Sequence, residues 1–228
     1  ENDTSVSYHF DDAADGYDTR NITIEREQGG KKKEFTMELY GQPQYGWIVM
    51  TDDGHPYLYT EIQSENDWRT MEVFDLKGEK IRHVGTSNDS PHGALLNDPD
   101  EFYLTRRVDA LGTYDAYRKF HVGESGMPVA ENDVYTKVNV CDSKEDEAAL
   151  VSTRELPVTV FDGNGKEEKL PAGTKYYVRA TDLESFVDME LSDGRRCRLA
   201  VKKSDKGWGF EIDGVYEEDC FEFIPYAG

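Results

Sequence analysis

Hydrophobic and polar residues alternate with a period of two through much of the last third of the chain. The pattern is clear in Thr174–Ala180, in Phe186–Leu191 and in Cys197–Val201. Such alternation is typical of half-buried β-strands, whose successive side chains point to opposite faces. Turn-forming residues separate these runs at Asp162–Gly165, Pro171–Gly173 and Asp193–Gly194. The pattern predicts a small β-barrel in the last ~75 residues, which begin at Leu156.

Short strand patterns also fill the first part of the chain. A hairpin is predicted where Asn21–Glu27 and Glu34–Tyr40 flank the turn Gly29–Gly30. Four more strands are expected at Trp47–Thr51, Tyr57–Gln63, Arg69–Leu76 and Lys80–Gly85. Four strands in this length match one propeller blade, but no second copy follows at a fixed period. The sequence therefore predicts an all-β protein whose N-terminal part is an antiparallel meander sheet or an open barrel.

The strand pattern is interrupted near residues 141–155, which we take as a domain boundary. In this stretch Asp142–Leu150 is the best helix candidate, because Ser143 and Asp146 approach a capping box and acidic residues suit a helix N-terminus. We expect an antiparallel β domain over 1–140, a short helical linker over 141–155 and a small barrel over 156–228.

The charge balance changes which partners are expected. The chain carries 47 acidic and 26 basic residues, a formal net charge of −21, which disfavours binding to a phosphate backbone and excludes nucleic acid as an expected partner. Aromatic residues make up 12% of the chain, which favours folded domains over an acidic disordered tail. No apolar run is long enough to span a bilayer, so no transmembrane segment is expected.

The titratable residues do not form a recognisable catalytic or metal motif. The five histidines lack any ligand spacing, and the Asp-rich stretch Asp11–Gly16 fails the EF-hand template, with Ala13 and Ile22 at positions that need ligands. We therefore expect no metal and no cofactor. No G-x-S-x-G elbow is present, and His121 with Cys141 is a candidate thiol–imidazole pair that the sequence alone does not bring together.

The remaining cysteines lie in the predicted barrel. Cys197 is in phase with Leu199 and Val201 on the apolar face of its strand, which favours a buried free thiol. A disulfide between Cys197 and Cys220 is the alternative, and the spacing leaves both open.

Three stretches of the last third carry a resemblance: Leu170–Asp182, Asp193–Leu199 and Phe221–Gly228. This part resembles the bacterial SH3-like domains of exported Gram-positive proteins. Segments of the first part, Pro99–Phe102, Leu111–Tyr114 and His121–Pro128, resemble uncharacterised proteins of gut Firmicutes that carry such a module. The resemblance implies a surface or secreted protein whose SH3-like part contacts cell wall or peptide, or supports the first domain.

The start of the chain agrees with export. It opens at Glu1 with a polar stretch and no initiator Met, as expected after removal of an export signal or lipoprotein leader. We expect a secreted protein or a cell-surface lipoprotein, and a monomer.

Aromatic side chains are the best candidates for a ligand site, since carbohydrate and peptide sites are commonly built on them. The candidates are Tyr57, Tyr59, Trp68, Tyr114 and Tyr117. Tyr57 and Tyr59 share one face of their strand and form an exposed strip if Leu58 points inward.

We expect a binding or accessory protein that takes a cell-wall polymer, an oligosaccharide or a peptide, with no catalytic residue assigned. One alternative is a secreted hydrolase with a site assembled from distant carboxylates or a Cys–His pair. The other is a purely structural protein-interaction module.

Overall fold

A computed structural model describes residues 4–11, 19–92, 96–138, 147–161, 165–205 and 207–227. In this part of the chain the secondary structure consists of β-strands and two three-residue 3₁₀ turns, η1 (Glu65–Asp67) and η2 (Glu217–Asp219). The protein is therefore all-β, as the alternating sequence pattern predicted. No helix in the described residues is long and apolar enough to cross a membrane.

The chain divides into two compact units. Unit 1 comprises Glu1–Arg106 and Lys119–Glu131, and unit 2 comprises Arg107–Arg118 and Asn132–Gly228. This division differs from the expected boundary at 141–155, because residues 107–118 and 132–138 group with the C-terminal part. Residues 141–146 of the expected helical linker 141–155 lie outside the described residues, and residues 147–155 contain the strand β12 (Leu150–Val151) and no helix.

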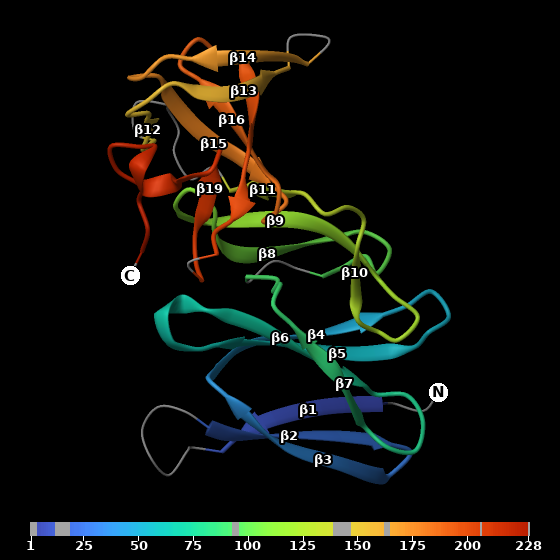
Figure 1. The fold of residues 1–228 in the computed structure, drawn as a ribbon. Coiled ribbons are helices and arrows are strands. Elements are labelled where there is room, and N and C mark those ends of the chain that lie inside the picture. The colour runs from blue at the N-terminus through green and yellow to red at the C-terminus, as the bar shows by residue number, and fades with distance from the viewer. Residues whose placement is uncertain are drawn as a thin grey trace. The chain divides into compact units, whose positions relative to one another are not determined.

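Unit 1 is a stack of antiparallel sheets (Figure 1). The first sheet has the order β1-β2-β3 and the second the order β4-β5-β6-β7. The bounds of these strands are β1 Thr4–Phe10, β2 Thr19–Gln28, β3 Lys31–Tyr40, β4 Gln42–Met50, β5 Pro56–Gln63, β6 Arg69–Asp75 and β7 Arg82–Ser87. The predicted hairpin and the four-stranded meander are confirmed, but they form two separate sheets.

A third layer is formed by β8 (Phe102–Asp109), β9 (Thr113–Val122) and β10 (Pro128–Ala130). Unit 1 contains the residues of these strands up to 106 and from 119 onward. Tyr57 and Tyr59 of β5 pack in one apolar cluster with Phe102 and Phe120. On the opposite face of β5, Leu58 joins a cluster with Ile22, Ile24 and other side chains of the first sheet. The second sheet is thus covered on both faces, which explains why β5 is buried along nearly its whole length.

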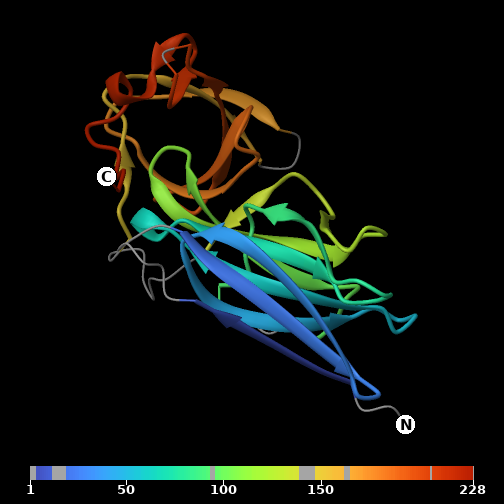
Figure 2. The same ribbon diagram turned by 90° about the horizontal axis from the view of Figure 1, so that it is seen from below.

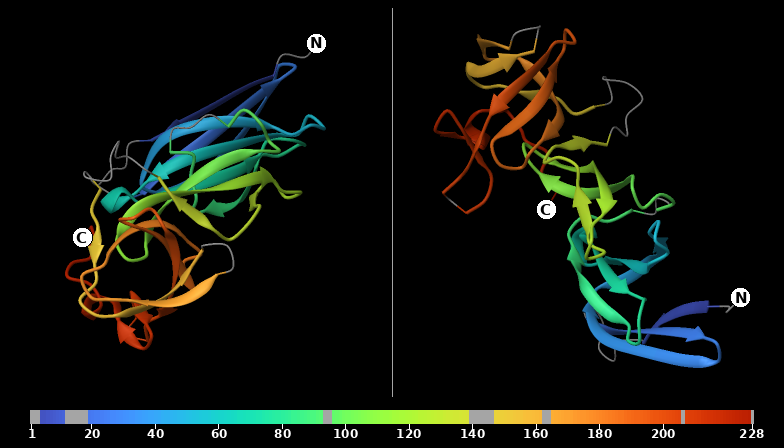
Figure 3. Two further views of the ribbon diagram at one scale, coloured as in Figure 1. Left: turned by 90° about the horizontal axis from the view of Figure 1, so that it is seen from above. Right: turned by 90° about the vertical axis from the view of Figure 1, so that its right-hand side faces the viewer.

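Unit 2 is built from short strands that curve around one interior, as Figure 2 and the left view of Figure 3 show. One apolar cluster fills this interior. Its main sheet runs β9-β11-β15-β16-β17-β13-β14, with β12 also paired to β15. The bounds are β11 Tyr135–Lys137, β13 Leu156–Val160, β14 Lys166–Leu170, β15 Lys175–Thr181, β16 Phe186–Leu191 and β17 Arg196–Ala200. A separate sheet of three short strands, in the order β18-β19-β20, completes unit 2: β18 Lys202–Lys203, β19 Phe210–Ile212 and β20 Val215–Tyr216.

Alternation along the strands of unit 2 places one side chain in two in the core. Val187, Met189 and Leu191 of β16 are buried beside Cys197 and Leu199 of β17. A β-bulge between Val178 and Ala180 lets β15 bend, so that its first residues pair with β12 and its last with β11. The predicted turns at Gly173 and Gly194 are present, each with a positive φ that suits glycine. The predicted turn at Asp162–Gly165 lies largely outside the described residues.

Candidate functional site

The chain passes from the first sheet to the second at Gly41, which separates β3 from β4. Gly41 has φ +111°, and a Cβ atom at this position would lie 2.7 Å from the carbonyl oxygen of Gln63 and 2.9 Å from Cγ2 of Ile62. Only glycine allows this close approach of the corner to the end of β5. The corner therefore fixes where β5 ends and where the following turn lies.

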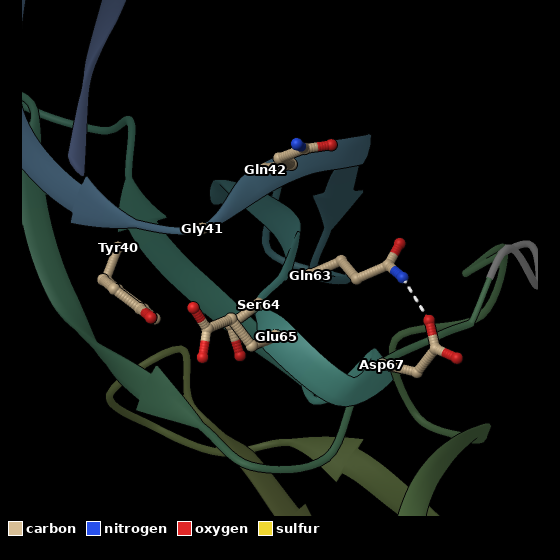
Figure 4. Close-up of a pocket in the computed structure, with 7 residues that line it drawn as sticks. All are labelled: Tyr40, Gly41, Gln42, Gln63, Ser64, Glu65 and Asp67. Carbon is tan, nitrogen blue, oxygen red and sulfur yellow. Dashed lines mark hydrogen bonds between the residues drawn. The ribbon is translucent and has the colours of Figure 1, made fainter. Parts of the chain in front are cut away.

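A cavity of about 270 Å³ lies at this corner. We call this cavity the corner pocket. It is lined by Tyr40, Gly41, Gln42, Gln63, Ser64, Glu65 and Asp67 (Figure 4). The side chains offer an aromatic ring, two amides, a hydroxyl and two carboxylates. A mixture of one aromatic and several hydrogen-bonding groups suits a polar ligand such as a sugar.

The turn η1 holds the polar side of the corner pocket in place. The N–H of Ser64 donates to the carbonyl of Trp68 at 2.7 Å, and the N–H of Trp68 donates to the carbonyl of Glu65 at 3.2 Å. The Gln63 amide donates through Nε2 to Oδ1 of Asp67 at 2.5 Å, the contact drawn in Figure 4. Tyr40 is 53% exposed, so its ring is accessible to a ligand.

Of the predicted site residues, Trp68 lies closest in the fold to this pocket. It follows η1 directly, and its side chain is 44% exposed. The residues of the pocket itself were missed by sequence reasoning. Tyr40 and Gln63 each end a predicted strand, and Ser64–Asp67 falls in the gap before the next predicted strand.

The expected exposed strip of Tyr57 and Tyr59 is wrong. Both side chains are buried, because the third layer covers the face of β5 on which they lie. The Tyr59 hydroxyl donates to the carbonyl of Gly126 at 2.6 Å, and burial raises the pKa of Tyr59. Tyr57 stacks on His55 with a centroid separation of 4.4 Å. These two tyrosines stabilise the layers of unit 1.

Tyr114 and Tyr117 belong to unit 2, so the five predicted residues are divided between the two units. Tyr114 packs against the apolar clusters of unit 2, and burial raises its pKa. Tyr117 is 37% exposed. Binding of a ligand by either residue stays a prediction.

Three buried carboxylates on β5 and β6 bear on the hydrolase alternative. Glu61 accepts a hydrogen bond from Nη1 of Arg69 at 3.1 Å and another from the backbone N–H of His92 at 2.6 Å. Glu61 pairs across the sheet with Met71, which packs toward the third layer. These two hydrogen bonds fix the Glu61 side chain, which does not line the corner pocket.

The other two carboxylates have imidazole partners. Oε2 of Glu72 lies 2.7 Å from Nε2 of His83, and Oδ1 of Asp75 lies 2.7 Å from Nε2 of His55. Burial opposes the charge of Asp75, but hydrogen bonds, chiefly from Arg82 and His55, outweigh it and lower the pKa of this carboxyl. Glu72 and Asp75 lie on opposite faces of β6, because residues alternate along a strand. They therefore do not form a convergent acid–base pair.

The thiols of the described residues are not activated. Cys197 and Cys220 are buried and free, so the predicted free thiol is confirmed at Cys197 and no disulfide joins the two. Burial raises the pKa of Cys197 to about 12, which keeps it protonated at neutral pH. Cys141, the partner proposed for His121, lies outside the described residues. No group of His, Cys, Asp and Glu side chains in the described ranges has the geometry to hold a metal ion.

Unit 2 contains one carboxyl that sequence reasoning did not single out. Glu217 of η2 is fully buried, and its Oε1 accepts a hydrogen bond from the Tyr226 hydroxyl at 2.6 Å. Burial raises the pKa of Glu217, while the bond from Tyr226 opposes the shift. This contact fastens the last described residues to the barrel.

Comparisons with known proteins add no relative. No family model, no curated protein and no solved structure matches this chain.

Proposed function

We propose that this chain is an exported or surface-anchored binding protein of a Gram-positive bacterium, and that the corner pocket of unit 1 takes an oligosaccharide of the cell wall. The observation that carries the proposal is the composition of the pocket lining. An exposed tyrosine ring stands beside amide, hydroxyl and carboxylate groups, with Trp68 exposed directly after them. Sugars bind to such combinations through stacking and hydrogen bonds.

The charge of the pocket narrows the ligand class. Glu65 and Asp67 contribute two carboxylates and the lining contains no basic residue. An acidic polymer would be repelled here, and by the net charge of −21. Neutral or amino-bearing sugar units are the expected ligands, in preference to teichoic-acid-type polyanions.

In this proposal unit 2 is an SH3-like module that supports unit 1 or contacts the wall. Five short antiparallel strands, β13 to β17, around one apolar core support that interpretation. The resemblance of the last third to exported bacterial SH3-like domains supports the surface location.

The test is calorimetric titration of the full chain with N-acetylglucosamine oligomers, with partly deacetylated oligomers and with soluble muropeptides. We expect Tyr40→Ala to weaken binding by roughly 5- to 10-fold, the range of one aromatic contact. Tyr45→Ala is the matched control, because Tyr45 is 54% exposed but lies outside the pocket lining. Equal losses in both variants would contradict the site, and the absence of any binding would overturn the function.

The same samples separate the hydrolase alternative. Mass spectrometry of the oligomers after long incubation should show no new fragments. Cleavage that survives Tyr40→Ala but is lost on replacing Glu61 or Glu72 would favour an enzyme with a different site.

A further inference from the structure

A second cavity of unit 1 differs in chemistry from the corner pocket. It has a volume of about 610 Å³ and opens at the ends of the first two sheets. We call it the edge cavity. It is lined by Thr4, Val6, Arg26, Gln28, Ile48, Met50, Gly54, Pro56, Leu76, Lys77 and Gly78. The volume falls within the range of about 300–1,000 Å³ that is usual for small-molecule sites.

The apolar wall of the edge cavity comes from the two facing sheets. Ile48 and Met50 of β4 pair with Leu58 and Pro56, so they point toward the first sheet, as Leu58 does. Leu58 is buried, yet Ile48 and Met50 remain 47% and 50% exposed. Two apolar side chains that face the interlayer space are therefore left uncovered, at the point where the edge strands β1 and β4 border the cavity.

Arg26 supplies a buried positive charge on the other wall. Alternation along β2 places it in phase with Ile22 and Ile24, and it is only 5% exposed. Its Nη2 donates to the carbonyl of Gly78 at 2.6 Å, while its Nε has no hydrogen-bond partner. No carboxylate of the described residues forms an ion pair with it. A buried guanidinium without a counter-charge is costly, and an anionic ligand would remove that cost.

The basic residues around Arg26 are consistent with this preference. Lys33 also donates to the Gly78 carbonyl, at 2.9 Å, and Lys77, which forms an ion pair of 3.5 Å with Asp53, lines the cavity. The lining contains no acidic residue, although acidic residues outnumber basic ones 47 to 26 in the whole chain. The edge cavity thus combines an anion-binding group with an apolar wall.

We propose that the edge cavity binds a fatty-acid-type ligand, with its carboxylate on Arg26 and its acyl chain along Ile48 and Met50. A guanidinium binds a carboxylate through two parallel N–H groups. Arg26 lines the cavity, and its one hydrogen bond to the protein, from Nη2 to the Gly78 carbonyl, uses one of its five N–H groups. A sugar would leave the apolar wall unpaired, and a neutral lipid would leave Arg26 unpaired. An amphiphilic monocarboxylate pairs its charged group with Arg26 and covers the apolar wall with its acyl chain.

The test is titration of the full chain with decanoate and with decanol, both below their aggregation limits. Decanoate should bind at least 10-fold more tightly than decanol, because only the acid satisfies Arg26. Arg26→Gln should remove this difference and weaken decanoate binding at least 10-fold. Lys32→Gln should leave both unchanged, because Lys32 is the neighbouring exposed cation on the opposite face of the same sheet, paired with Glu25.

A second variant keeps the proposal testable if Arg26→Gln does not fold. Met50→Glu places a carboxylate at a half-exposed edge position and should weaken decanoate binding at least 10-fold by repulsion. Methyl resonances of Ile48 and Met50 should shift during titration of the unmodified chain with decanoate. Equal affinity for decanoate and decanol, or no methyl shifts on binding, would overturn the proposal. Tighter binding of a short peptide through its C-terminal carboxylate would also overturn the acyl-chain assignment.

Discussion

Gly41 shows how much of unit 1 depends on one residue. Its φ of +111° and the 2.7 Å approach to the Gln63 carbonyl leave no room for a side chain. The residue turns the chain from the first sheet into the second and also lines the corner pocket.

Gly41→Ala should destabilise the protein by about 3 kcal/mol, because backbone strain and a steric clash act together. Gly30→Ala is the matched control. Gly30 has φ +74° but nothing within 4 Å of an added Cβ, so only the backbone term of about 1 kcal/mol applies. Urea denaturation of the two variants measures the difference, and equal losses would contradict a clash at the corner.

Arg26 and the pair Tyr57–Tyr59 show what residue patterns can and cannot predict. Arg26 occupies an inward position in phase with Ile22 and Ile24, so a period-two pattern contained the signal for a buried charge. The tyrosines were misplaced because the pattern of β5 was taken to describe a sheet covered on one face. A strand buried on both faces has no polar side. The residue types of Tyr57 and Tyr59 therefore do not indicate that a further layer covers their face of β5.

At the scale of elements, the hairpins and the meander were predictable because local turns connect neighbouring strands. The strand β1 was missed, since the short apolar series Val6, Tyr8 and Phe10 stands in a polar stretch. The grouping of residues 107–118 with the barrel could not be predicted either, because it depends on pairing between β9 and the distant β11. The corner pocket required the same kind of information, because the pairing of β4 with β5 brings Tyr40–Gln42 beside Gln63–Asp67.

The turn between β15 and β16 is organised by one carboxylate. Oδ1 of Asp182 accepts hydrogen bonds from the N–H groups of Glu184, Ser185 and Phe186 at 2.8–3.0 Å. Burial opposes the charge of Asp182, but these bonds and that of the Ser185 hydroxyl outweigh it and lower its pKa to about 2. The turn is therefore most stable when Asp182 is ionised.

Asp182→Ala should lower the free energy of unfolding by about 1–2 kcal/mol at pH 7, the value of hydrogen bonds to a charged group. Because the folded pKa lies below the unfolded one, this contribution is present above about pH 4 and is lost as the pH falls toward 2. Thermal unfolding between pH 2 and pH 7 measures it. Asp205→Ala, at an exposed aspartate, should change little. A difference that stays constant down to pH 2 would contradict the assignment.

At the scale of the whole molecule, the last described residues complete unit 2. The N–H of Thr113 donates to the carbonyl of Pro225 at 3.0 Å, and the N–H of Ala227 donates to the Thr113 hydroxyl. Tyr226 holds the buried Glu217. Hydrogen bonds between residues more than one hundred positions apart thus hold the two ends of unit 2 together.

A chain ending at Ile224 should lose about 3 kcal/mol from unit 2, because an aromatic contact and several hydrogen bonds disappear. In differential scanning calorimetry the transition of unit 2 should fall by roughly 10–15 °C while that of unit 1 stays in place. Phe223→Ala is the control, because this side chain is 72% exposed. One shared transition, or equal shifts of two, would contradict the prediction.

This closing contact has a consequence for biosynthesis. Unit 1 ends at Glu131, but unit 2 begins at Arg107 and needs Pro225 beside Thr113. A chain leaves the ribosome or a translocation channel N-terminus first, so unit 1 emerges in full while residues 107–118 still lack their partners. At roughly 5–20 residues per second, that segment waits on the order of 5–20 seconds. During this interval Ala110 and Leu111 lack the C-terminal strands with which they form the core of unit 2.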